Sequence, residues 1–592
     1  MSDASHDAAS GLPPGRAGVV AAVALLGGVL AGLRPVAGLD IWWHLRTGER
    51  LWHQAGWLSV ERLSDGAAGR PWPYKDIASD VLLYLAYAAG GDAVLSWLPA
   101  LVAALLAASL WVGTPRRAGG TAVWAALAIA ALASMLHRLH ARPMLFSLLA
   151  FAALLPLCER GRRDARWQAQ VPVLLLLLVW GWLHRGVLLG VGVAAASAAA
   201  VTASTPLPGR LLRGVVVLVL GGLAAVANPN GLATLATATA LVGGEAFRAH
   251  VSEWQAMPLD VWLRHHGTLL VPVVVASAAV VAGVRRGGWQ ALGDPFALVL
   301  ALGTLALAAS SARYLPYAAL ASARVALLLL PATLPARISG AFAALTLALL
   351  GFLAWERPAS PLRPDGGFVG LQVDRYPGDA LAYARREALP AEVENAYDFG
   401  GYLLWFADGW LRPSVDGRAD MVYAPDAFDL ALRAEHDPEA FARQQALHDR
   451  SWVLARQEPG GRTHGFLARD PGWALVFWSE PAAIFVRCDR HAALCERDGL
   501  RLFRGVALDA QAFAHGRDPS RREPARAELE RMRAMAPGSV RVRVAEVVLH
   551  HAAGERARRD ALLEVLVREH GESMAVRALL ERLSRAASAP AE

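Results

Sequence analysis

Lysine is almost missing from this chain, so its basic charge comes from arginine. Lys75 is the only lysine among 58 basic residues, and the formal net charge is +7. Such an arginine bias reflects genomic composition, and no soluble segment alternates basic residues with aromatic residues that could stack on bases. The sequence therefore predicts no nucleic-acid partner.

Charged residues are also scarce, at 18% of the chain against 55% hydrophobic residues. This balance excludes a soluble multidomain protein and is typical of a mostly α, polytopic membrane protein bound by membrane lipids. Residues 1–16 predict a disordered cytoplasmic leader, and residues 17–356 a transmembrane domain. No small-x-small cleavage site precedes Asp40, which disfavours a signal peptide. About eleven segments, several of them short for a bilayer, are predicted to span the membrane: Ala17–Leu33, Ala93–Val112, Thr121–Leu136, Pro143–Leu157, Val171–Leu183, Val187–Ala203, Val215–Ala227, Thr268–Val284, Pro295–Ala309, Tyr314–Ala332 and Ile338–Trp355.

Arginines in the short connections predict the orientation. Every second connection carries an excess of arginine, as cytoplasmic connections do. The N-terminus is therefore predicted to be cytoplasmic. Residues 34–92 and 228–267 then form outward loops, and everything after Trp355 is exported. The arginines concerned are Arg116, Arg117, Arg160, Arg162, Arg163, Arg166, Arg210, Arg213, Arg285, Arg286 and Arg337.

The exported part is predicted to contain two units. Over residues 357–510, β-like runs such as VENAYDFGGYLLWF, SWVLAR, ALVFW and AAIFVRC alternate with helical stretches, which indicates an α/β domain. Residues 519–586 carry Ala, Leu, Arg and Glu at helical spacing. They predict two or three antiparallel helices, similar to a tetratricopeptide tail, with a plain helical hairpin as the alternative. A tail of this kind offers a surface for a protein partner.

Two features of the exported domain leave alternatives open. In VDGRADMVY, Asp416, Arg418 and Asp420 predict either a carboxylate site or a turn in which Arg418 pairs with a neighbouring acid. Cys488 and Cys495 both fall in the exported domain, where the sequence leaves two alternatives open, a disulfide in an oxidising compartment or a buried free pair. Their spacing does not suggest a zinc site.

The stretch LDIWWHLRTG follows the first apolar segment directly and is expected at the membrane surface. A helix beginning at Asp40 would place Asp40, His44 and Thr47 on one face. Trp42 and Trp43 would then hold this face at headgroup depth. The alternative is an interfacial anchor helix whose polar residues are only solvated.

Three short outward turns carry basic side chains although the positive-inside rule disfavours them there. One interpretation is a convergent cluster that binds a phosphate, with Arg324 as a further member. The alternative is that the arginines extend to headgroup phosphates independently. The turns contribute Arg138 and Arg142 in HRLHAR, His184 and Arg185 in WLHRG, and Arg313 in SSAR.

Several of these stretches together resemble a known group of proteins. LDIWWHLRTGERLW, PWPYKDIASDVLLYL, WGWLHRG, NPNG with VSEWQ, and NAYDFGGYLLWF with VDGRAD occur in this order. The order is similar to that of bacterial polytopic proteins placed with the C-type glycosyltransferase superfamily. The resemblance implies transfer of a sugar from a polyprenyl-phosphate-linked donor to an acceptor on the outer face of a bacterial inner membrane. It spans roughly Ala17 to Cys488 and lacks a WWDYG-type motif.

The resemblance also implies roles for individual residues. Asp40 resembles the first-loop acid of the superfamily and would act as the base in an inverting transfer. The basic turns would stabilise the departing phosphate. Because Asp40 does not stand in a DxD pair, a divalent metal stays open, and no other cofactor is expected. Acceptor or metal contacts are expected from His44, Asp76, Asp80 and Glu253.

Two other classes of protein fit parts of the sequence. A transporter would more often show internal repeats and broken helices near the midplane, and none is found in the sequence. A non-catalytic scaffold, whose spans anchor the exported domain and the helical tail, is the stronger alternative. A scaffold would tolerate replacement of Asp40, whereas a transferase that uses it as a base would not.

Overall fold

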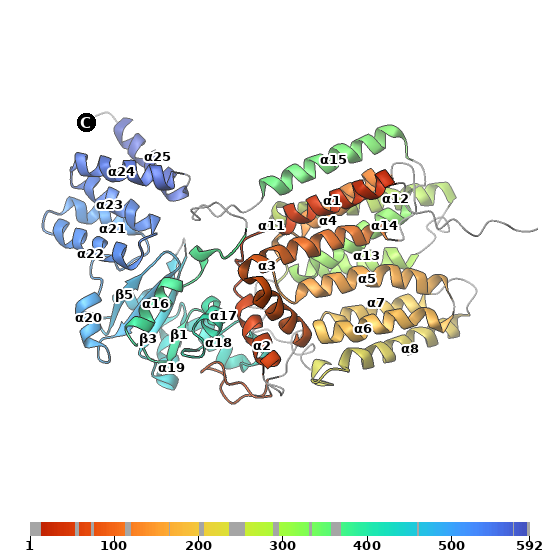
Figure 1. Ribbon diagram of the computed structural model, residues 1–592, viewed down its shortest axis with the longest axis horizontal. Helices are drawn as coiled ribbons and strands as arrows, with labels where there is room; N and C mark the ends of the chain where they lie inside the picture. Colours follow the sequence, from red (N-terminus) through yellow and green to blue (C-terminus); the bar gives the residue numbers. More distant parts are fainter. Residues whose placement is uncertain are drawn as a thin grey trace, which may run out of the picture.

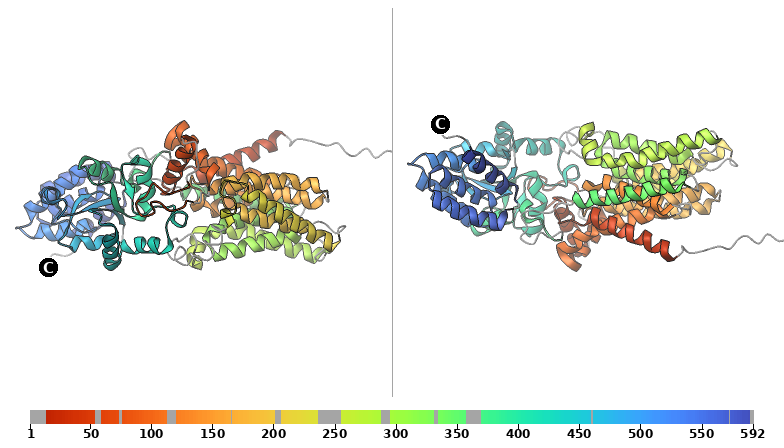
Figure 2. Two further views of the ribbon diagram at one scale, coloured as in Figure 1. Left: turned by 90° about the horizontal axis from the view of Figure 1, so that it is seen from below. Right: turned by 90° about the horizontal axis from the view of Figure 1, so that it is seen from above.

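The computed structural model describes residues 14–53, 59–72, 76–112, 120–164, 166–200, 206–235, 255–287, 295–330, 334–356, 369–458, 461–571 and 573–588. The described chain is mostly helical and elongated. A bundle of long helices forms one end, and a sheet domain with a helical tail forms the other (Figure 1). Views from below and from above, each turned by 90° about the long axis, show the same arrangement (Figure 2).

Each predicted spanning segment coincides with a helix of the bundle. Five helical stretches, α3, α5, α8, α15 and the stretch Leu259–Arg285, are long and apolar enough to cross a membrane by length and composition. This is the arrangement of a multi-pass membrane protein, while the count of eleven spans stays a prediction. The helices are α1 (Pro14–Gly32), α3 (Ile77–Trp111), α4 (Gly120–Ser134), α5 (Met144–Arg163), α6 (Val171–Leu183), α7 (Val187–Ala199), α8 (Leu207–Val226), α11 (Leu259–His266), α12 (Leu270–Gly287), α13 (Pro295–Ser310), α14 (Leu315–Leu329) and α15 (Ala336–Trp355).

α3 differs from the prediction because it begins well before Ala93. Its backbone kinks at Gly90 and Gly91, and Gly91 has a φ of 59°, a left-handed conformation that glycine adopts without strain. The kink divides α3 into a first half that carries Asp80 and a second half inside the bundle.

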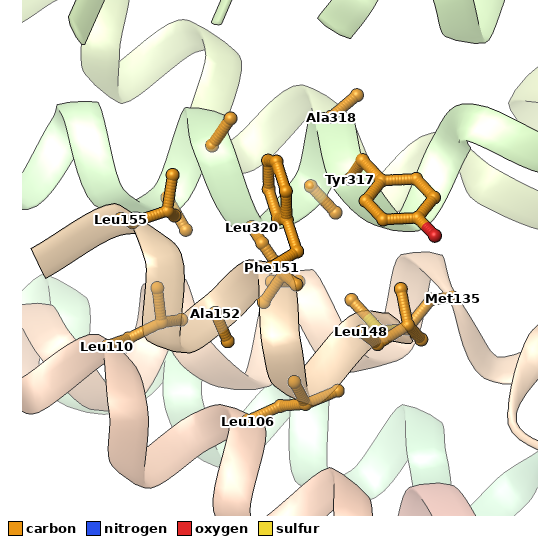
Figure 3. Packing of buried hydrophobic residues seen from close by; sticks show 14 of the residues in the cluster. Leu106, Leu110, Met135, Leu148, Phe151, Ala152, Leu155, Tyr317, Ala318 and Leu320 are labelled. Carbon is orange, nitrogen blue, oxygen red and sulfur yellow. The ribbon is translucent and has the colours of Figure 1, made fainter. Parts of the chain in front are cut away.

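α4 is the central helix of the bundle, since every residue from Val123 to Ser134 is buried. Its alanines allow neighbouring helices to approach closely, as small residues do in membrane bundles. Beside it, Phe151 of α5 meets Tyr317 of α14 edge to face, with ring centroids 5.1 Å apart (Figure 3). The outer helices α8 and α15 instead expose apolar side chains, as expected of a surface that faces lipid.

The connections between helices fall at two ends of the bundle. Those that join α4 to α5, α6 to α7, and α13 to α14 face the sheet domain, and the arginine-bearing C-terminal ends of α5 and α12 lie at the far end (Figures 1 and 2). Arg116 and Arg117 lie outside the described residues. At the far end, Arg213 Nη2 donates to the carbonyl oxygen of Arg166 at 2.9 Å. At the near end, His266 Nδ1 donates to the carbonyl oxygen of Ser134 at 2.7 Å. Which end faces the cytoplasm stays a prediction from the arginine pattern.

Thiol labelling tests this orientation. Gln168 at the far end and Ala446 in the sheet domain are both exposed, so Gln168→Cys and Ala446→Cys present accessible thiols. In intact spheroplasts, a membrane-impermeant maleimide is expected to label Ala446→Cys only. After the cells are lysed, both variants should react, which controls for accessibility. Labelling of Gln168→Cys alone in intact spheroplasts would reverse the orientation.

Arg324 lies away from the basic turns, so its predicted membership of their cluster is wrong. Its Nε and Nη2 donate to the two carboxylate oxygens of Glu159 at 2.8 Å and 2.7 Å. Its Nη1 donates to the carbonyl oxygens of Leu110 and Val112, where α3 ends. Arg324 therefore provides hydrogen-bond donors for carbonyl oxygens at the C-terminal end of α3, inside the far half of the bundle.

The sheet domain is built on one mixed sheet of six strands. They are β1 (Glu392–Asn395), β2 (Arg412–Pro413), β3 (Trp452–Glu458), β4 (Gly461–Arg462), β5 (Trp473–Trp478) and β6 (Ala482–Arg487). The order is β2-β1-β3-β6-β5, with β4 paired to β3. β1 pairs in parallel with β2 and β3, and β6 pairs antiparallel with β3 and β5. The runs SWVLAR, ALVFW and AAIFVRC are strands, as expected of the predicted α/β domain.

Helices surround this sheet and form the tail. The run FGGYLLWF, expected to be β-like, is the helix α17 (Tyr397–Phe406) instead. Cys488 and Cys495 form a disulfide, the first of the two alternatives left open by the sequence, with Cα atoms 5.7 Å apart. The predicted tail region contains four helices rather than two or three, and its tetratricopeptide character and protein partner stay predictions. The helices are α16 (Gly378–Arg386), α17, α18 (Pro425–Ala434), α19 (Pro438–His448), α20 (Ala492–Asp498), α21 (Leu508–Arg517), α22 (Arg522–Met535), α23 (Val540–Ala552), α24 (Arg556–His570) and α25 (Met574–Ser588).

Candidate functional site

α2 (Ile41–His53), which carries the LDIWWHLRTG stretch, lies between the bundle and the sheet domain (Figure 1). It packs closely on α17, where a Cβ at Gly401 would lie 2.8 Å from the carbonyl oxygen of Leu39. The glycines of FGGYL therefore allow close backbone approach. Because of this approach, α2 is enclosed by protein on most sides.

Trp42 and Trp43 of α2 face protein rather than headgroups, so the interfacial anchoring predicted for these two side chains is wrong. Trp42 is 0% exposed and Trp43 is 6% exposed. Trp42 meets Tyr376 edge to face at 5.4 Å and Phe406 at 4.8 Å between ring centroids. Trp43 packs with Val415 in the sheet domain. Composition alone could not distinguish a tryptophan at the membrane interface from one buried in protein. In both places the apolar ring is buried and its N–H lies near polar groups.

The polar face of α2 meets the first turn of α3. A Cβ at Gly48 would overlap the carbonyl oxygen of Asp80, so only glycine lets the two helices approach this closely. One turn earlier, His44 Nδ1 lies 2.6 Å from Asp80 Oδ1. His44 is 5% exposed and Asp80 is 1% exposed. The sequence predicted both residues near the site, but it did not predict that they form a buried imidazole–carboxylate pair.

The other predicted acids of the outward loops occupy different places. Asp40 is half-buried and lies against the sheet domain, where a Cβ at Gly417 would be 2.5 Å from Asp40 Oδ1. Asp76 is buried and precedes α3, where its carbonyl oxygen accepts the Asp80 N–H at 2.8 Å. Glu253 lies outside the described residues.

The turn between α6 and α7 holds His184 in one orientation. Its Nδ1 accepts a hydrogen bond from the backbone N–H of Gly186 at 3.0 Å and lies 2.7 Å from the Ser147 hydroxyl. Trp180 Nε1 donates to Ser147 Oγ at 2.6 Å, and the Tyr317 hydroxyl also hydrogen-bonds Ser147. Because Nδ1 accepts from a backbone N–H, the proton of the neutral imidazole is on Nε2.

Three of the predicted cations converge on this turn. Burial lowers the pKa of His184 well below its ordinary value, and the charges of Arg313, Arg185 and Arg142 lower it further. His44 acts on the same ring, which brings the imidazole–carboxylate pair within electrostatic reach. Arg142, Arg185 and Arg313 are each half-buried, and the predicted role of this cluster in binding a phosphate stays a prediction.

Arg138, also predicted for this cluster, lies mainly with a second group of histidines. Burial lowers the pKa of His140 well below its ordinary value, and Arg34, Arg142 and Arg138 lower it further. His137 lies beside His265, with ring centroids 5.3 Å apart. Arg142 thus acts on both groups, whereas Arg138 is not among the main charges that act on His184.

The VDGRAD run forms a buried ion-pair cluster, which was the second of its predicted alternatives. Arg418 Nε and Nη2 donate to the two carboxylate oxygens of Asp416 at 2.8 Å and 2.7 Å. Its Nη1 and Nη2 also donate to the carboxylate of Glu61 in the outward loop. Burial acts to raise the pKa of Asp416, but Arg418 outweighs it and holds that pKa below its ordinary value. The side chain of Asp420 is outside the described part of the structure.

Sequence reasoning missed the uncharged polar residues around His184. Ser147 and Tyr317 lie within apolar segments, and a buried hydroxyl in such a segment was the available signal. Glu61 was missed because its partner Arg418 is far away in the sequence. Among the residues that the structure describes, no group of three His, Cys, Asp or Glu side chains could hold a metal ion.

Comparisons with known proteins add little to this site. No family model and no curated protein matches the chain. It is similar to the crystal structure of ArnT from Cupriavidus metallidurans bound to undecaprenyl phosphate, at 16% identity and a TM-score of 0.35, over 80% of this chain and 98% of that one. The apo ArnT structure from the same organism has 16% identity and a TM-score of 0.37, over 81% and 99% of the two chains. With TM-scores this low, the role of each residue depends on its contacts in this chain.

Proposed function

We propose that this protein is a membrane glycosyltransferase-like enzyme that takes a sugar from a polyprenyl-phosphate-linked donor on the outer face of the membrane. The observation that carries the proposal is the convergence of Arg142, Arg185 and Arg313 on His184, beside a buried imidazole–carboxylate pair. An inverting transfer needs these two parts, cations for the departing phosphate and a base for the acceptor proton.

The basic turns suit a phosphate at the membrane surface. Each guanidinium group can give a phosphate two parallel hydrogen bonds. The neutral His184 adds an N–H donor from Nε2 without adding charge. Because His184 Nδ1 is fixed by Gly186, this donor keeps its direction when a ligand leaves. Arginines that only extended to lipid headgroups would need no such fixed donor among them.

The scaffold alternative explains the site less well. In a scaffold, the membrane spans would only hold the exported domain at the membrane for its partners. A flexible linker between the spans and that domain would be sufficient. The sheet domain is instead joined to the outward loop by the buried Glu61–Arg418 pair, and it encloses α2. This enclosure protects the His44–Asp80 pair from water, which a transfer reaction needs and a scaffold does not.

Binding of undecaprenyl phosphate to the purified full-length protein tests the proposal. Arg185→Lys and Arg313→Lys keep the charge but lose the paired hydrogen bonds. Each is expected to weaken binding by about tenfold or more, because a hydrogen bond to a charged group contributes about 1.5–3 kcal/mol and 1.4 kcal/mol equals tenfold. Arg138→Lys is expected to have a smaller effect.

Arg163→Lys is the matched control, since Arg163 is an exposed arginine at the far end of the bundle. It should bind undecaprenyl phosphate as the wild type does. Wild-type affinity in both Arg185→Lys and Arg313→Lys, or no binding by the wild type, would remove the phosphate site and leave the scaffold as the better explanation.

A further inference from the structure

We propose that the first half of α3, which precedes the kink at Gly90 and Gly91, lies along the bilayer surface and that lipid covers its exposed face. The bilayer surface concerned is the one on the side of the sheet domain. This contact involves a different part of the chain from the basic turns, and it does not depend on the proposed transfer function.

α3 is longer than a membrane span requires. It has 35 residues, whereas about 20 residues are sufficient to cross the hydrocarbon core of a bilayer. Residues 92–111, which follow the kink, are enough for the span. The residues before the kink therefore lie beyond the hydrocarbon core, at the bilayer surface or outside it.

Both ends of the first half are held at the end of the bundle that faces the sheet domain. At the N-terminal end, the Ser79 hydroxyl donates to the carbonyl oxygen of Leu183 at 2.6 Å, and Leu183 is the last residue of α6. At the C-terminal end, the left-handed backbone of Gly91 joins the first half directly to the spanning half. A helix held at one depth at both ends runs along the bilayer surface rather than away from it.

The first half carries no charged residue on any face, because none occurs between Asp80 and Asp92. Leu83 on its inner side is buried in the cluster that contains Trp42 of α2. A helix with one face in water carries polar or charged residues there, whereas a helix that is apolar all round is covered by protein or lipid. The exposed and half-exposed side chains at i, i+3, i+4 and i+7 are Leu82, Leu85, Ala86 and Ala89.

Aromatic side chains with polar edges lie beside this face. The Tyr84 hydroxyl lies 2.8 Å from Nε2 of His53 in α2, and the neighbouring Trp52 is exposed. Tyr84 and Tyr87 both meet Trp405 of α17, with ring centroids 6.4 Å and 5.4 Å apart. Tyrosine and tryptophan are enriched where headgroups meet the hydrocarbon core, so these side chains favour lipid over a protein partner as the cover.

The spanning half of α3 continues into this surface. Trp97, Leu101 and Leu105 are exposed and lie four residues apart, so they form one stripe along the helix. Trp97 is at the end of the stripe nearest the sheet domain, where an interfacial tryptophan is expected. Gly90 precedes Trp97 by about two helical turns, so the first half begins at the depth of the headgroups.

The contact also sets the depth of one basic turn. Ser79 binds the carbonyl oxygen of Leu183, which directly precedes His184 in the turn between α6 and α7. A helix that rests on the bilayer surface therefore holds this turn at the level of the headgroups.

Fluorescence quenching of the full-length protein in nanodiscs tests the contact. Leu82→Cys and Ala89→Cys are labelled with bimane and reconstituted in lipids whose acyl chains are brominated near the headgroup, or in the unbrominated lipids. Both labels are expected to lose fluorescence in the brominated lipids and to keep most of it in the presence of iodide, a quencher that stays in water.

Two labelled variants serve as matched controls. Leu101→Cys carries its label on the exposed stripe of the spanning half, and brominated lipid should quench it. Ala446→Cys carries its label on an exposed residue of the sheet domain, and iodide should quench it. The wild type, treated with bimane in parallel, controls for labelling of the buried free Cys158.

Equal fluorescence in brominated and unbrominated lipids at either Leu82→Cys or Ala89→Cys would overturn the inference. Iodide then distinguishes the two remaining arrangements. Quenching by iodide would place the face in water, and protection from both quenchers would place it against protein, such as a second copy of this chain.

Discussion

Arg418→Met is expected to destabilise the exported domain and its contact with the outward loop by about 3–5 kcal/mol, the usual cost of removing one partner of a buried ion pair. Arg418, Asp416 and Glu61 are all 0% exposed. Methionine fills similar space, so the substitution removes the charge rather than the packing. It leaves two carboxylates facing each other without a cation, and the guanidinium contact with the Trp72 ring at 4.7 Å is also lost.

The measurement is hydrogen exchange of the full-length protein, followed over residues 59–72 and 412–423. Backbone amides of Leu63 and Ser64, which donate to the Glu61 carboxylate at 2.6 Å and 2.7 Å, should exchange much faster in Arg418→Met. Arg412→Met is the control, because Arg412 forms a surface pair with Glu392 in the same domain and such pairs contribute about 0–1 kcal/mol. Equal exchange in the two variants would show that the cluster does not hold the loop.

The bundle could be predicted from sequence because each helix carries its own signal. A run of apolar residues is sufficient to place a helix such as α6 (Val171–Leu183), and its bounds agree with the prediction. α3 was predicted only from Ala93 onward, because Asp80 and the Gly90–Gly91 pair interrupt the apolar residues before it. Its first half packs on α2 through Gly48, a contact that no local pattern records.

The site was predicted in its residue types but not in its pairings. Short turns necessarily bring His184 and Arg185 to the surface of the bundle, so their convergence with Arg313 could be expected. The pairing of His44 with Asp80 depends on how two helices cross, and that crossing is set by Gly48. Arg324 does not join these cations but pairs with Glu159 inside the bundle. Its position depends on its depth along the helix, which a hydropathy pattern does not give.

Gly48→Ala is the second change with a large expected effect, because the crossing of α2 and α3 depends on this glycine. The added methyl group would overlap the carbonyl oxygen of Asp80, which is backbone and cannot rotate away. Overpacking of this kind costs about 1–3 kcal/mol. The helices would also separate at the level of His44, and a displacement of about 1 Å can lower a reaction rate by about 10²-fold.

Gly192→Ala is the matched control for this substitution. Gly192 also lies inside a helix, α7, but a Cβ there would meet nothing within 4 Å. Both changes replace a helical glycine by alanine and gain the same intrinsic helix propensity, about 1 kcal/mol. Any difference between them in melting temperature and in the release of undecaprenyl phosphate from an undecaprenyl-phosphate-linked sugar therefore reports the contact with Asp80. We expect Gly192→Ala to match or exceed the wild type in melting temperature and Gly48→Ala to lose both stability and release. Equal behaviour of the two variants would mean that α2 and α3 can separate without cost, and His44 would then not depend on Asp80 for its orientation.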